Sequence, residues 1–132
     1  MTITRRDTIN IPASSSALRS ILLDAAHLPD WNPAFSAVTA QGAVRAGEPL
    51  AIRVRGVLKG RLVYDRVDAD AIEMTVTVPG LTEHSSWRLA AAGEATTVTH
   101  ELSQRGPLAE WLEPATRDIA TLRLTRLLER VR

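Results

Sequence analysis

Apolar and polar residues alternate through the middle of the chain, from Phe35 to Ser103. A period of two is typical of strands with one buried and one exposed face. The alternating apolar positions are Leu50, Ile52, Val54, Val63, Val67, Ile72, Met74, Val76, Val78, Trp87, Leu89, Val98 and Leu102. Turn-forming residues separate the runs at Lys59-Gly60, Asp68–Ala71, Pro79-Gly80 and Ala91–Glu94. The pattern predicts an antiparallel meander of six strands.

The N-terminal segment has a different spacing. Residues 2–11 are rich in β-branched side chains and end before Pro12, which predicts a further strand. The serines at 14–16 can cap a short helix. Two prolines within residues 27–33 exclude regular structure there, so the short helical part ends in that segment.

Residues 107–131 have helical periodicity, with Pro107 suited to a first turn. One apolar face contains Leu108, Trp111, Leu112, Ala115, Ile119 and Leu122, and is predicted to cover the sheet. Pro114 is expected to kink this helix. Further on, the apolar stripe moves to Leu124, Leu127, Leu128 and Val131. This second stripe is expected to pack on the sheet edge or first strand, and the alternative is a homodimer contact.

Together these elements predict an α+β fold. It is a seven-stranded curved antiparallel sheet with two short helices and a long C-terminal helix that enclose a cavity. With 132 residues and no linker or repeat, the chain is expected to form a single domain, 1–132.

Composition excludes several classes of function. The 16 basic and 15 acidic residues give a net charge of +1, so nothing favours nucleic acid as a partner. The absence of cysteine excludes disulfides and thiolate metal sites. No apolar run approaches the ~20 residues of a membrane span, and the first residues lack the apolar core of a signal peptide. A cytoplasmic protein is therefore expected.

Four local motifs occur in the order found in a known superfamily. They are Ile9-x-Ile11-Pro12-Ala13, Asp24-x-x-x-x-Pro29-x-Trp31-x-Pro33, Gly93-x-x-Thr96-Thr97-Val98-Thr99-His100 and Gly106-Pro107-Leu108. With the order of elements, they make the chain similar to the START-related, pollen-allergen-like helix-grip superfamily (SRPBCC). The closest resemblance is to its bacterial polyketide cyclase/dehydrase and lipid-transport-like branch. The resemblance implies a helix-grip fold with an internal cavity, but it leaves the function open.

Pairing the strands by their turns predicts which side chains face the cavity. The turns give an inward row of Val54, Asp65, Met74, Ser85 and His100 across the sheet. Glu83 becomes a diagonal neighbour of His100. The outward face takes Arg53, Arg55, Tyr64, Arg66, Glu73, Thr75, His84 and Arg88.

Three inward ionisable residues are candidate catalytic groups: His100, Asp65 and Glu83. His100 could act as a general acid or base with Glu83 or Asp65. The alternatives are a histidine that is merely hydrogen-bonded by Ser85 or Glu83, an aspartate at the rim or paired with a neighbouring arginine, and a glutamate at the cavity mouth rather than deep inside.

Candidate ligand-binding residues are those expected to line the cavity. They are Trp31, Phe35, Val54, Met74, Ser85, Trp87, Trp111, Leu112, Ala115 and Ile119. The aromatic members could stack on a flat ligand, or they could simply fill the core. The three histidines have no metal-ligand spacing, and no nucleophile arrangement or phosphate-binding glycine loop is present, so neither metal nor cofactor is expected.

These features lead to three functional hypotheses. The first is binding of a hydrophobic, polyketide- or lipid-like small molecule, with cofactor-free cyclisation or dehydration if the polar residues move protons. The second is a carrier or sensor without catalysis. The third is a dimeric interaction module with a filled cavity.

Overall fold

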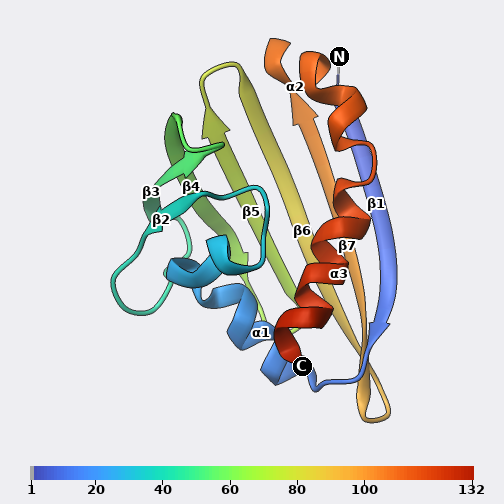
Figure 1. Cartoon of the computed structure of the whole chain (residues 1–132). Coiled ribbons are helices and arrows are strands. Elements are labelled where there is room, and N and C mark those ends of the chain that lie inside the picture. Colours follow the sequence, from blue (N-terminus) through green and yellow to red (C-terminus); the bar gives the residue numbers. More distant parts are fainter. Residues whose placement is uncertain (1) are drawn as a thin grey trace.

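A computed structural model describes residues 2–132. Seven antiparallel strands form one sheet in the order β1-β7-β6-β5-β4-β3-β2 (Figure 1). The strands are β1 (Thr2–Ile11), β2 (Ala37–Thr39), β3 (Pro49–Val54), β4 (Leu58–Val67), β5 (Ala71–Val78), β6 (Leu81–Ala92) and β7 (Ala95–Arg105). The predicted helix-grip fold and its seven-stranded sheet are confirmed.

Helices cover one face of this sheet. They are α1 (Ser15–Leu23), η1 (Ala25–Asp30), α2 (Pro107–Leu112), η2 (Glu113–Thr116) and α3 (Ile119–Val131). The Oγ of Ser14 accepts a hydrogen bond from the N–H of Ala17, as expected for a helix cap. In Figure 1, α3 runs along the sheet beside β7 and β1, and α1 lies near its C-terminal end.

The C-terminal helix is broken rather than merely kinked. Proline has no N–H, so Pro114 cannot continue the helical hydrogen bonds, and the chain passes through the short 3₁₀ turn η2 before α3 begins. The break changes which residues face inward. The predicted face is wrong for Trp111, which is 78% exposed, and for Leu122, which is 39% exposed. Arg123 is buried instead.

The second apolar stripe packs within its own chain, as the first of its two interpretations predicts. Leu124 and Leu127 are fully buried, and Leu128 and Val131 pack against the same core. Leu128 and Val131 are half-buried, and the homodimer contact that was the alternative remains a prediction.

The β3–β4 turn differs from the prediction. It lies at residues 55–57, because Val54 pairs with Leu58 and Ile52 with Gly60. Lys59-Gly60 is therefore within β4. A Cβ on Gly60 would lie 2.0 Å from the carbonyl oxygen of Thr77, so this glycine is required by close backbone approach and not by a turn.

A β-bulge between Tyr64 and Arg66 reverses the predicted orientation of β4 before the bulge, whereas Val67 still pairs with Ile72 as predicted. Tyr64 is buried on the inner face, whereas Val63 points to the outer face beside Thr75. Asp65 is exposed, and its carboxylate accepts a hydrogen bond from the Thr75 hydroxyl. The prediction that Asp65 faces the cavity is wrong, because the extra residue shifts the alternation by one.

The last hairpins keep the predicted faces. Met74 pairs with Ser85 and Ile72 with Trp87, as expected. The β6–β7 turn has two residues rather than four, so this register is shifted by two positions. An even shift preserves orientation, which leaves His100 inward but places it opposite Trp87.

Candidate functional site

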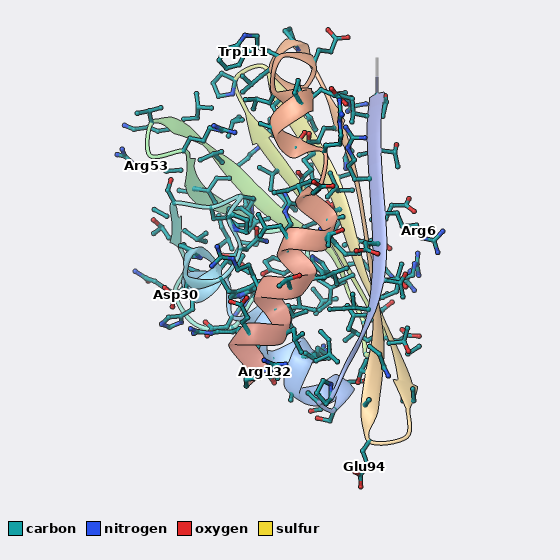
Figure 2. All side chains as sticks on the ribbon, turned by 45° about the vertical axis from the view of Figure 1, so that its right-hand side comes forward. Arg6, Asp30, Arg53, Glu94, Trp111 and Arg132 are labelled. Carbon is teal, nitrogen blue, oxygen red and sulfur yellow. The ribbon has the colours of Figure 1, made fainter. Side chains whose placement is uncertain are left out.

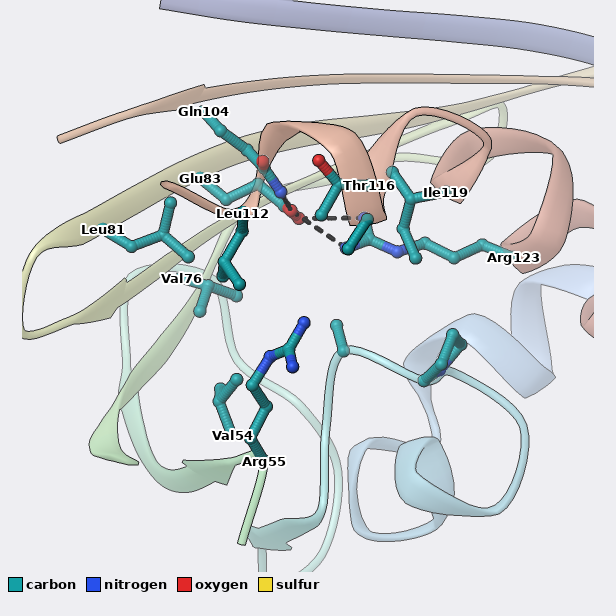
Figure 3. A pocket seen from close by; sticks show the side chains of 13 residues that line it. Val54, Arg55, Val76, Leu81, Glu83, Gln104, Leu112, Thr116, Ile119 and Arg123 are labelled. Atoms are coloured by element: carbon teal, nitrogen blue, oxygen red, sulfur yellow. Dashed lines mark hydrogen bonds and ion pairs between the residues drawn. The ribbon is translucent and has the colours of Figure 1, made fainter. Parts of the chain in front are cut away.

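A cavity of about 320 Å³ lies between the inner face of the sheet and the broken C-terminal helix (Figure 3). Its apolar lining consists of Pro33, Ala34, Val54, Val76, Leu81, Leu112, Ala115 and Ile119. Its polar lining consists of Arg55, Glu83, Gln104, Thr116 and Arg123. Such a volume is at the small end of the range for small-molecule sites.

Glu83 and Arg123 form the polar end of this cavity. Nη1 and Nη2 of Arg123 each donate to one oxygen of the Glu83 carboxylate, both at 2.9 Å (Figure 3). The amide nitrogen of Gln104, which pairs with Glu83 across β6 and β7, donates to the same carboxylate at 2.7 Å. All three residues are buried. The bidentate geometry fixes α3 to the centre of the sheet.

The same contacts determine the charge of Glu83. Burial alone would raise the pKa of this carboxyl, but the charge and hydrogen bonds of Arg123, together with the hydrogen bond from Gln104, outweigh it. The net result is a pKa below the usual value, so Glu83 is ionised at neutral pH. Glu83 and Arg123 therefore form a neutral pair of opposite charges.

His100 lies behind this pair and does not line the cavity. Its Nδ1 lies 3.0 Å from the carbonyl oxygen of Ser86 and therefore donates, which leaves Nε2 to accept from Nη1 of Arg123 at 3.3 Å. Its ring stacks on Trp87 with a centroid distance of 3.7 Å. Burial and the charge of Arg123 lower the pKa of His100 to about 3, so the ring is neutral.

The remaining predicted residues fall into two groups. Val54, Leu112, Ala115 and Ile119 line the cavity, as does Glu83. Trp31, Phe35, Met74 and Trp87 belong to the packed core. Trp31 and Trp87 meet edge to face, with their ring centroids 5.7 Å apart.

Ser85 and Trp111 are outside the cavity. Ser85 is half-buried but is not a lining residue. Figure 2 shows Trp111 on the outside of the molecule, at the end of α2. The broken helix is the reason, because it turns α2 away from the predicted common face.

Sequence reasoning missed four polar lining residues: Arg55, Gln104, Thr116 and Arg123. One signal for Arg123 was available. An inward glutamate at position 83 needs a cation, and the covering helix is rich in arginine. A helical wheel drawn for one continuous helix could not identify which arginine is buried. The break at Pro114 changes which side of the following helix faces the sheet.

Residues 2–132 contain no group of three or more His, Asp or Glu side chains placed to hold a metal ion. Over the same range, no helix is both long and apolar enough to cross a membrane.

Comparison with known proteins gives one family. The model described as polyketide cyclase/dehydrase and lipid transport matches residues 2–132. No curated protein matches the chain in sequence.

Solved structures share its fold at low sequence identity. A START superfamily protein from Mycobacterium smegmatis is 17% identical with a TM-score of 0.69, covering 98% of this chain and 99% of its own. The Zhui aromatase/cyclase from Streptomyces sp. R1128 is 15% identical with a TM-score of 0.74, covering 99% and 94%. Norcoclaurine synthase from Thalictrum flavum, in complex with dopamine and hydroxybenzaldehyde, is 14% identical with a TM-score of 0.71, covering 99% and 86%.

Proposed function

Because the chain belongs to the polyketide cyclase/dehydrase and lipid transport family, we propose that it binds a small hydrophobic molecule of polyketide or lipid type in the cavity under the C-terminal helix. The observation that carries the proposal is the cavity itself. Its wall is mainly apolar, and the two buried charges at its inner end form an ion pair with each other. An apolar ligand can therefore enter without leaving an unpaired charge.

The proposal favours binding without catalysis over proton transfer. Glu83 accepts three hydrogen bonds, and its lowered pKa makes it a weak base. Both nitrogens of His100 already have hydrogen-bond partners, the Ser86 carbonyl and Arg123, and His100 does not line the cavity. Asp65 lies on the opposite face of the sheet. The three candidate catalytic residues thus do not converge on one point, as a cyclase mechanism through them would need.

The proposal can be tested by locating a bound apolar probe. We suggest titrating the isotope-labelled protein with N-phenyl-1-naphthylamine, a neutral fluorescent probe, while amide chemical shifts are followed by NMR. Saturable shifts are expected at Val54, Val76 and Ile119, which belong to three different walls of the cavity. Shifts confined to the outer-face hollow at His84 and Glu101, or no saturable shift, would argue against the cavity as the binding site.

A further inference from the structure

Arg55 lies at the mouth of the cavity, in the β3–β4 turn. The strand alternation predicts that it points to solvent on the outer face. Instead it follows the last residue of β3, and Figure 3 shows its guanidinium directed toward the middle of the cavity, across from Arg123. The position of the turn, rather than strand alternation, determines where this side chain points.

The charges that line the cavity do not balance. Its charged residues are Arg55, Glu83 and Arg123. Glu83 and Arg123 cancel each other in the buried pair. None of the ion pairs within residues 2–132 includes Arg55. The cavity therefore has one uncompensated positive charge, at its mouth.

The backbone at Arg55 is unusual as well. Its φ of 54° makes it the only non-glycine residue with a positive φ among residues 2–132. For an arginine this conformation is unfavourable by roughly 1–2 kcal/mol. Strained positions of this kind concentrate at ligand-binding sites.

Ser36 holds the β3–β4 turn in place. It follows Pro33 and Ala34, which line the cavity. The Ser36 hydroxyl accepts from the N–H of Gly56 at 2.8 Å and donates to the carbonyl oxygen of Arg53 at 3.0 Å. The Ser36 N–H donates to the same carbonyl at 2.9 Å. These bonds on both sides of residue 55 keep the Arg55 side chain at the cavity opening.

We infer that the ligand is a hydrophobic monoanion, a carboxylate whose apolar body fills the cavity while Arg55 binds the carboxyl group at the mouth. The inference rests on the proposed function and names the ligand class of the same site. A guanidinium matches a carboxylate with two parallel N–H donors. One free positive charge suits one negative charge. The inner pair repels no part of such a ligand, since its net charge is zero.

The test compares two probes that share a naphthalene body and differ in their head group, a carboxylate in one and an uncharged alcohol in the other. 2-Naphthoate and 2-naphthylmethanol are each used to displace N-phenyl-1-naphthylamine from the protein. We expect the wild type to bind the carboxylate about fivefold to tenfold more tightly than the alcohol. The variant Arg55→Gln is expected to remove that preference.

Arg53→Gln is the matched control. Arg53 lies two residues before Arg55, is exposed and does not line the cavity, so this variant removes the same charge from outside the site. It is expected to keep the preference for 2-naphthoate. The inference is overturned if the wild type does not prefer the carboxylate, or if Arg53→Gln and Arg55→Gln reduce the preference equally. In both cases displacement of the neutral probe would still support the cavity as a binding site. Failure of N-phenyl-1-naphthylamine to bind would count against the proposed function instead.

Discussion

Arg123 on α3 reaches Glu83 on β6 with two hydrogen bonds of equal length, 2.9 Å each, inside the protein. The pair joins the covering helix to the sheet at the inner end of the cavity. Buried ion pairs contribute little net stability, because desolvation of the two charges offsets their attraction. Removing one partner is costly, however, since the other charge then remains buried and unpaired.

Glu83→Gln is therefore expected to lower the free energy of unfolding by about 3–5 kcal/mol. The amide cannot neutralise Arg123, which is 4% exposed in the native protein. Urea denaturation measures the loss. Glu101→Gln is the control, because it breaks the exposed pair with Arg6 and should change the free energy by no more than about 1 kcal/mol.

Replacing both partners tests whether the unpaired buried charge, rather than altered packing, causes the loss of stability. Glu83→Leu combined with Arg123→Met is expected to recover most of the stability that Glu83→Gln loses, because no buried charge remains. If the single variant were as stable as the wild type, the pair would have to be hydrated rather than buried.

His100 should make stability depend on pH in a defined window. The folded protein keeps the ring neutral, with a pKa of about 3, whereas the unfolded chain takes up a proton near pH 6.5. Below pH 6.5 the unfolded state thus binds more protons, and stability falls as the pH falls, by up to about 1.4 kcal/mol per unit. Above pH 6.5 this contribution is constant.

Urea denaturation at pH 5, 6 and 7 tests this expectation. His100→Phe retains a ring to stack on Trp87 and should flatten the dependence. His84→Phe, on the exposed outer face, should retain it. An equal slope in the wild type and His100→Phe would show that other groups cause the pH dependence.

Tyr64 links the sheet to the first helix. Its buried hydroxyl donates to the carbonyl oxygen of Leu22 at 2.6 Å, near the end of α1, where carbonyls lack helical partners. Tyr64→Phe should lower the free energy of unfolding by about 1–2 kcal/mol, because this carbonyl then loses its donor. Ser20→Ala removes an exposed hydroxyl of α1 and should lower the free energy of unfolding by less than about 0.5 kcal/mol. Urea denaturation measures both variants. Equal effects of the two variants would show that the hydrogen bond from Tyr64 to Leu22 does not stabilise the fold.

The fold could be predicted from the sequence because the alternation and the turn residues agree over most of the chain. Strand pairing was correct where the turn was tight and unambiguous, as for Pro79-Gly80 between Val78 and Leu81. It failed at Gly60, where close approach to Thr77 looks the same in a sequence as a turn. It failed again at Asp65, because a bulge leaves no clear mark in the apolar pattern.

The candidate site was harder to predict for the same reasons. One bulge moved Asp65 to the outside and Tyr64 to the inside. A turn shorter by two residues pairs Glu83 with Gln104, so Glu83 is not the expected diagonal neighbour of His100 and the two residues share Arg123 instead. The central contact, from Arg123 to Glu83, joins residues 40 positions apart, and it depends on the helix phase after Pro114. The apolar pattern of the helix residues does not determine how α3 is rotated after this break.

Filling the cavity with a larger side chain shows whether a small hydrophobic molecule binds there. Ile119 lines the cavity, whereas Leu122, one turn further along α3, points outward. We expect Ile119→Trp to weaken binding of N-phenyl-1-naphthylamine by about tenfold or more, and Leu122→Trp to leave it unchanged. Fluorescence titration of the folded variants measures both affinities. Equal affinities for wild type and Ile119→Trp would show that the probe binds outside the cavity.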